Sequence, residues 1–108
     1  MAAAYDVVVS PKAQREARGL SDRVAEAFGD AYGDSVNRRI VAAIDSLDRM
    51  PTRFTRVRHL MGRRYVYRRV LVGRAHRVIF TVDEAARRVE VVRVDLQRSD
   101  PASLDDLP

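Results

Sequence analysis

Residues 67–80, which read YRRVLVGRAHRVIF, decide the fold predicted for this chain. Two runs rich in β-branched and aromatic residues flank Gly73, and such runs on either side of a glycine are typical of a β-hairpin. In the second run the apolar side chains alternate, which places them on one face of a strand. We therefore predict a hairpin of two antiparallel strands, over 64–72 and 76–82.

A third strand is predicted after this hairpin. Residues 83–86, Asp-Glu-Ala-Ala, are typical of a turn, and an apolar run of strand length follows over 89–94. Successive strands joined by short turns form an antiparallel meander. From Gln97 the chain is polar, and we expect a short, loose polar tail over 99–108.

Two helices are predicted before the hairpin. Ser10 and Pro11 suit the cap and the first position of a helix, and apolar residues then recur at helical spacing over 11–28. A second series with the same spacing covers 36–47, and Gly-Asp pairs at 29–30 and 33–34 punctuate the chain before it. The two series predict an antiparallel helical hairpin.

The predicted class is α+β, with the order β-α-α-β-β-β. Residues 5–9 read as the first strand, which should join the sheet at an edge or beside the last strand. The helical hairpin should pack on one face of a small, mainly antiparallel sheet. We expect a single domain over 1–98, with a core that contains Leu47, Val78, Phe80, Val82 and Val91.

The charge of the chain is strongly basic and unevenly placed. The net charge is +5 and the isoelectric point is near 10.4. Residues 53–77 contain nine arginines and neither aspartate nor glutamate. Because so one-sided a stretch produces a positive surface, the expected partners are anionic.

Several classes of function are disfavoured by composition. The chain contains no cysteine, and its histidines are His59 and His76, so neither a disulfide framework nor a metal site is expected. No apolar run approaches the roughly 18 residues of a membrane span. The N-terminal residues lack the pattern of a signal peptide, so we expect a cytoplasmic protein that needs no cofactor.

The order of elements, the length and the charge resemble the RelE/ParE superfamily of toxins from type II toxin–antitoxin systems, over about residues 5–101. Residues 67–80 are similar to the strand-turn-strand signature of that family. Three shorter matches stand in the same order as in the family: Ser10-Pro11-x-Ala13, Leu47-Asp48-x-x-Pro51 and Leu60-Met61-Gly62.

The resemblance implies a growth-inhibiting toxin that a cognate antitoxin neutralises within a hetero-oligomer. Antitoxins of this class are small, acidic and partly disordered, and they fold as they bind. The basic surface is therefore the expected docking site for antitoxin or nucleic acid. Its candidate residues are Arg58, Arg63, Arg64, Arg68, Arg69 and Arg74.

RelE-like members cut messenger RNA at the ribosome, and this activity is one alternative. Cationic groups must then stabilise the phosphorane, and Arg68, Arg77 and Arg98 match basic positions of the family. A nuclease needs Arg68 and Arg77 on one side of the sheet, and as neighbours across the hairpin they could face each other, with His76 as a weak candidate base. Val70 stands where a second basic residue is expected, and no aromatic residue or histidine follows Phe80.

ParE-like members poison DNA gyrase without chemistry of their own, and this is the alternative that we favour. The helical hairpin is long, as in those members, and residues 98–101 resemble their Arg-Asp-Pro ending. A third alternative is a basic nucleic-acid-binding or ribosome-associated module with no toxin activity, which composition alone permits. Fold does not decide among these activities.

Overall fold

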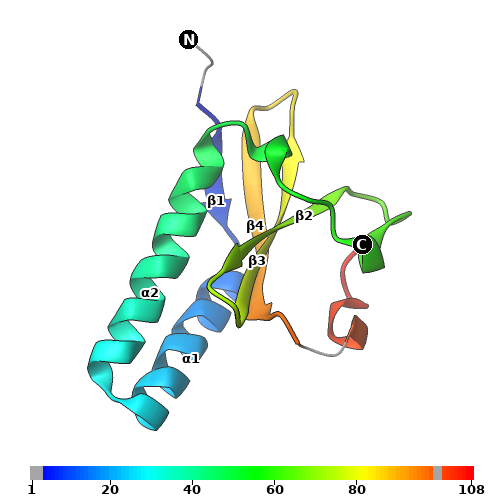
Figure 1. The fold of residues 1–108 in the computed structure, drawn as a ribbon. Coiled ribbons are helices and arrows are strands. Elements are labelled where there is room, and N and C mark those ends of the chain that lie inside the picture. Colours follow the sequence, from blue (N-terminus) through cyan, green and yellow to red (C-terminus); the bar gives the residue numbers. More distant parts are fainter. Residues whose placement is uncertain (1–3, 99–100) are drawn as a thin grey trace.

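The computed structural model describes residues 4–98 and 101–108, and its element order confirms the predicted α+β plan (Figure 1). Two helices follow the first strand, and three strands come after a long irregular segment. The elements are β1 (Asp6–Val9), α1 (Pro11–Phe28), α2 (Asp30–Asp45), β2 (Tyr67–Val72), β3 (His76–Asp83) and β4 (Arg88–Leu96).

The described strands form one four-stranded sheet in the order β1-β4-β3-β2. β2, β3 and β4 make the predicted antiparallel meander, and β1 pairs in parallel with β4. β1 therefore lies at an edge and beside the last strand, as expected. A parallel pair needs a long crossover, and α1 and α2 provide part of the connection.

The two helices begin and meet as their local sequence dictates. Ser10 Oγ accepts a hydrogen bond of 3.1 Å from the Ala13 amide, which caps α1. Gly29 joins the helices with a φ of 102°, a conformation that favours glycine. Gly33 lies inside α2 rather than before it, and a Cβ there would stand 2.8 Å from the Ala25 Cβ of α1. The second glycine thus permits close helix packing.

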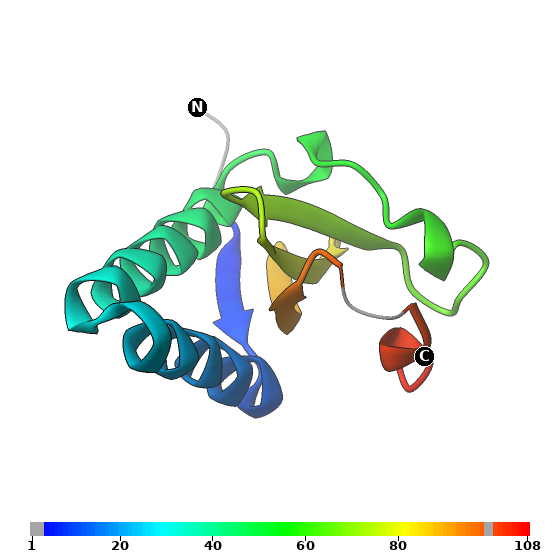
Figure 2. The same ribbon diagram turned by 60° about the horizontal axis from the view of Figure 1, so that its bottom comes forward.

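The main core lies between the helical hairpin and one face of the sheet (Figure 2). Leu47, Val78, Phe80 and Val91 are buried there as predicted. The prediction for Val82 is wrong in degree, since this residue near the end of β3 is only partly buried. Burying an aromatic side chain such as Phe80 contributes about 1.5–3 kcal/mol.

The segment between α2 and β2 is irregular, and it covers the outer edge of β2. Short 3₁₀ helices span 46–48, 51–53 and 58–60. The Val57 amide donates to the Tyr67 carbonyl at 2.8 Å, and the Arg69 amide donates to the Thr55 carbonyl at 3.0 Å. These bonds satisfy backbone groups that an edge strand would otherwise leave open.

The C-terminal segment, defined here as residues 101–108, does not match the predicted loose tail. It forms a 3₁₀ helix over 101–104 and lies against the sheet (Figures 1 and 2). Leu104 is only 1% exposed and belongs to a second apolar cluster with Val57, Leu60 and Ile79. The expectation of looseness is wrong because two leucines interrupt the polar sequence and find apolar contacts on the sheet.

Candidate functional site

The sheet face turned away from α1 and α2 (Figure 2) is called the open face here, and it contains the charged residues Arg77, Arg93 and Asp95. Side chains of a strand alternate between faces, so the cluster around Ile79 lies opposite the helix-covered core around Phe80. Tyr67 on β2 belongs to this second cluster. The open face thus combines a small apolar centre with charged surroundings.

Arg77 is held by an acidic neighbour across the sheet. Its Cα lies opposite that of Asp95 on β4. The Nε and Nη2 atoms donate to the two carboxylate oxygens at 2.7 and 3.0 Å. The side chains are only 12% and 14% exposed. Paired donors of this kind give a strong, oriented ion pair, and the charge of Arg77 is locally compensated.

Arg68 and Arg77 do not face each other, so the hairpin does not have the arrangement that messenger cleavage would need. Arg68 lies opposite Phe80, whereas Arg77 lies opposite Leu71. Cross-strand partners share a face, so Arg68 is on the side of Phe80, under the helices, and Arg77 is on the open face. The Arg68 Nη1 donates to the Phe54 carbonyl at 2.8 Å. One phosphate cannot lie between two side chains on opposite faces.

The remaining candidates for catalysis are also dispersed. Arg98 is exposed beyond the end of β4, and residues 99–100 of the predicted Arg-Asp-Pro ending lie outside the described residues. His76 is partly buried at the start of β3. Burial and the positive charge of Arg23 lower the pKa of His76, so its imidazole is neutral at pH 7.

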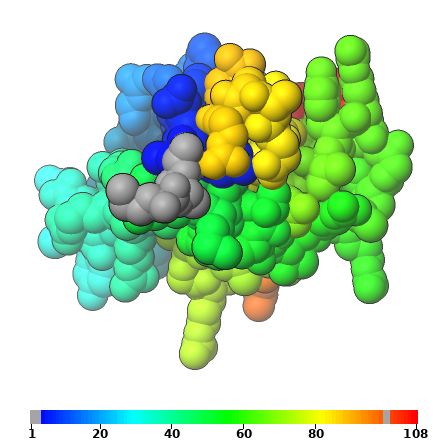
Figure 3. Space-filling model, turned by 90° about the horizontal axis from the view of Figure 1, so that it is seen from above, coloured from blue at the N-terminus to red at the C-terminus, as the bar shows by residue number. Residues whose placement is uncertain are grey.

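The six arginines proposed for docking divide into free and engaged residues. Arg58, Arg64 and Arg74 are exposed, and within the described residues no acidic side chain pairs with them. The segment 58–66, green in Figure 3, protrudes at the edge of the molecule. Arg63 and Arg68 instead form internal contacts, and Arg69 is partly buried on β2.

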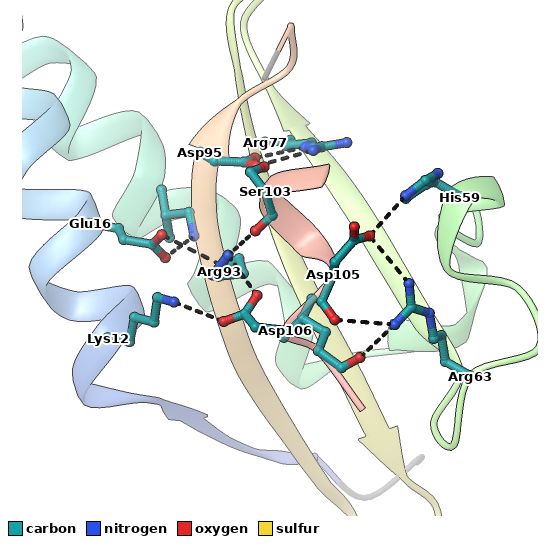
Figure 4. Close-up of polar contacts among 12 residues, drawn as sticks. Lys12, Glu16, His59, Arg63, Arg77, Arg93, Asp95, Ser103, Asp105 and Asp106 are labelled. Carbon is teal, nitrogen blue, oxygen red and sulfur yellow. Dashed lines mark hydrogen bonds and ion pairs between the residues drawn. The ribbon is translucent and has the colours of Figure 1, made fainter. Parts of the chain in front are cut away.

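Arg93 is a functional candidate that sequence reasoning missed. It is the buried charged residue of the open face, at 6% exposure (Figure 4). Its Nη2 donates to Asp106 Oδ1 at 3.1 Å and to the Ser103 carbonyl, and its Nε lies 3.6 Å from Glu16 Oε2. Among the residues that the structure describes, Nε and Nη1 have no hydrogen-bond partner. A buried donor left unsatisfied costs about 1–3 kcal/mol.

Glu16 connects α1 to this cluster and to the backbone of β4. Its Oε1 accepts a hydrogen bond of 3.1 Å from the Val94 amide, beyond the point where β1 stops pairing with β4. Burial raises the pKa of Glu16, although the Val94 amide and the charge of Arg93 oppose this shift. The Glu16 carboxylate therefore satisfies the Val94 amide of β4 at a point where β1 no longer pairs with that strand.

The acids of the C-terminal segment meet cations from three other parts of the chain (Figure 4). Asp106 lies 3.0 Å from the Lys12 Nζ, and this hydrogen bond, with further help from Arg93, lowers the pKa of Asp106. Asp105 lies 3.5 Å from Arg63 and 3.6 Å from His59. The segment is therefore held by charge as well as by its leucines.

A cleft of about 610 Å³ opens between the C-terminal segment and the β3–β4 end of the sheet. Burial raises the pKa of Tyr67 in its wall. Its charged lining is mixed in sign, so the cleft does not present the concentrated positive charge that a phosphate group needs. Members of this lining include Arg64, Tyr67, Thr81, Arg88 and Glu90.

The sequence held little signal for the Arg93 cluster. Its partners Glu16 and Asp106 come from opposite ends of the chain. A register shift also separates the pairs Ile79–Arg93 and Phe80–Val91, so simple alternation fails in β4. The one usable signal was an arginine within the apolar run 89–94, where a charge needs a partner.

Comparison with known proteins places the chain in a family. The sequence profile described as the ParE toxin of type II toxin–antitoxin systems matches residues 7–101. The chain belongs to the ParE toxin family. It is therefore a toxin of the type II toxin–antitoxin class, and the family assignment made from the sequence is confirmed.

Solved structures support the fold of this ParE family member. A chain of the chromosomal ParDE system from P. aeruginosa is similar with a TM-score of 0.70 at 14% identity, covering 85% of this chain and 95% of that one. A chain of the RelBE toxin–antitoxin complex from Mycobacterium tuberculosis gives 0.58 at 21% identity, covering 92% and 98%. No curated protein sequence matches the chain.

Two further properties bear on the class of protein. None of the helices in the described residues is long and apolar enough to cross a membrane. The described residues likewise contain no group of three histidine, cysteine or acidic side chains that could hold a metal ion.

Proposed function

We propose that this toxin poisons DNA gyrase and that a cognate antitoxin silences it. The observation that carries the choice of target is the placement of Arg68 and Arg77 on opposite faces of the sheet. The proposal places the action of the toxin in the cytoplasm, because gyrase and the chromosome are there. ParE family membership supports the same choice.

Messenger cleavage is the competing activity, and its chemical requirements argue against it. The developing charge of the phosphorane needs cationic donors that converge on one point. Arg77 is instead bound by both oxygens of Asp95, and Arg68 donates to a backbone carbonyl. A gyrase poison needs no such convergence, so the dispersed arginines are compatible with that activity.

The target is tested with purified toxin, DNA gyrase, ATP and supercoiled plasmid. We expect linear, cleaved plasmid, while messenger RNA on ribosomes stays intact in a parallel reaction. Arg77→Ala should retain plasmid cleavage if circular dichroism shows that the variant is folded. Messenger cleavage that Arg77→Ala abolishes, with no effect on plasmid, would overturn the proposal.

The antitoxin is proposed to dock on the exposed arginines with an acidic, partly disordered segment, and to form a hetero-oligomer with the toxin. Complementary charge accelerates association and makes it sensitive to salt. Arg58, Arg64 and Arg74 are the residues to test, because they are exposed and unpaired by acids within the described residues.

The corresponding experiment measures association with the protein of the adjoining antitoxin gene. The triple variant Arg58→Ala/Arg64→Ala/Arg74→Ala should associate at least several-fold more slowly at low salt, and the difference should shrink at high salt. The matched control replaces Arg15, Arg18 and Arg38, which are exposed on the helices. Equal slowing by both triple variants would indicate a general charge effect rather than a docking site.

A further inference from the structure

The C-terminal segment lies on the open face in the manner of a bound peptide. Leu104 and Leu107 pack against a small cluster that contains Val57, Leu60 and Ile79. This cluster is separate from the core under the helices. The core under the helices thus contains neither of these two leucines, which fill apolar pockets, called the sockets here, on the other side of the sheet.

The polar contacts of the segment also resemble those of a ligand rather than those of a strand. The Arg64 amide donates to the Pro108 oxygen at 2.7 Å, while side chains supply other donors: Arg63 to the Leu107 carbonyl at 3.1 Å and Arg93 to Ser103. Its two aspartates are more than half exposed, at 55% and 61%. Exposed ion pairs of this kind exchange readily with water and ions.

Arg93 shows that the segment does not satisfy the site completely. Its side chain is 7% exposed, and Nε and Nη1 have no hydrogen-bond partner among the described residues. The neighbouring Asp106 meets Nη2 alone, and Glu16 lies 3.6 Å from Nε. A buried guanidinium with free donors is a receptor for a better-placed carboxylate.

We propose that the open face is a docking site for an acidic, leucine-bearing segment of a partner protein, and that residues 101–108 occupy this site in cis. The cis segment has the sequence PASLDDLP, in which two leucines flank two aspartates. The sockets hold the leucines, and Lys12, Arg63 and Arg93 form ion pairs with the two aspartates. A partner segment must displace the cis segment in order to bind.

The apolar sockets distinguish a peptide from a nucleic acid. Phosphates would suit the cations, but nothing in a nucleic acid backbone replaces two branched aliphatic side chains three residues apart. The sockets contain aliphatic and tyrosine side chains that pack on leucine. The site therefore recognises apolar side chains and carboxylates together, which is characteristic of peptide binding.

The probe for this inference is a fluorescent synthetic peptide of residues 101–108. The receiving proteins are the full chain and its variant Leu104→Ser/Leu107→Ser, in which the cis segment loses its apolar anchors. A cis segment acts at an effective concentration of about millimolar, so it should outcompete the free peptide in the full chain. We expect the peptide to bind the variant at least tenfold more tightly.

Two controls isolate the leucines and the charges. A peptide with both leucines replaced by serine should not bind the double variant. Adding Lys12→Ala and Arg63→Ala to that variant should weaken peptide binding several-fold and reduce its salt dependence, whereas adding Arg38→Ala, at an exposed arginine of α2, should not. Should the serine variant unfold, Asp105→Asn/Asp106→Asn keeps the leucines and should still raise peptide affinity over the full chain.

Three outcomes would overturn the proposal. One is a folded double variant that does not bind the peptide, and another is equal binding by the leucine-free peptide. The third is a single-stranded RNA oligonucleotide that binds the variant and is not displaced by excess peptide, which would assign the face to nucleic acid. None of these measurements depends on whether gyrase is the target of the toxin.

Discussion

The two faces of the sheet are built from different interactions. The helix-covered face is apolar, and it packs against two helices that the spacing of their own apolar residues predicts. Phe80 of the sheet and Ile40 of α2 are almost entirely buried between them. The open face has a small apolar cluster, a buried arginine and a short segment from the end of the chain. The difference teaches that one face maintains the fold, while the other is held by contacts that a partner could replace.

The largest predicted effect is a loss of stability from a substitution on the helix-covered face. Phe80→Ala removes a fully buried ring and should lower the free energy of unfolding by about 3–5 kcal/mol, since a cavity remains. Urea unfolding followed by circular dichroism measures it. Phe28→Ala, at a ring that is 70% exposed, is the control and should change stability by less than about 0.5 kcal/mol.

A smaller loss is predicted on the open face. Leu104→Ala should cost about 2 kcal/mol, the low end for a buried leucine, because the C-terminal segment can move to reduce the cavity. Hydrogen exchange should show faster exchange in the segment and around Ile79, with the amides of α1 unchanged. A loss as large as that of Phe80→Ala, spread over the helices, would contradict the comparison.

The Arg77–Asp95 pair tests how strongly a charge pair stabilises the open face. Arg77→Ala should cost about 1–3 kcal/mol, because it leaves a mostly buried carboxylate without its two donors. A double-mutant cycle with Asp95→Ala separates this pairing from the loss of each side chain. Additive effects of the two single substitutions would show that the pair contributes nothing.

The smallest predicted effect is a dependence on pH. The pKa of Asp106 is lowered in the folded protein, so its stabilising contribution is present above about pH 4 and is lost as pH falls through the lowered pKa. The pKa of Glu16 is raised above the ordinary glutamate value of about 4.3, because its charged form is partly buried. Protonation of Glu16 therefore removes the cost of burying its charge as pH falls through the raised pKa. The two carboxyls therefore act in opposite directions.

Asp106→Asn separates these contributions. The stability difference between the variant and the original chain should be full at pH 7 and should shrink only below about pH 4, as pH falls through the lowered pKa of Asp106. Urea midpoints across pH 3–7 measure it. A difference that stays constant over this range would mean that the charge of Asp106 does not stabilise the segment.

The helix-covered face could be predicted from the sequence because its signals are local. Helical spacing in 11–28 and alternation around Phe80 each arise within a few residues, and both reappear in the structure. The capping by Ser10 was likewise readable. The role of Gly33 was not, since it depends on the neighbouring helix rather than on its own sequence.

The open face could not be predicted because it depends on register and on distant pairings. The hairpin register pairs Val72 with His76, which puts Arg68 and Arg77 out of phase, and a miscount of one residue reverses the face. The C-terminal segment looked polar because its composition is polar, although Leu104 and Leu107 decide its position.

The placement of the last strand has a consequence for biosynthesis. β4 lies inside the sheet between β1 and β3, so Val7 finds its neighbour Val89 only after both helices and the β2–β3 hairpin have been made. Closing so long a loop is entropically costly and tends to occur late in folding. A nascent chain on the ribosome therefore has α1 and α2 ready while its sheet is incomplete, and the toxin fold arises only after β4 has been made.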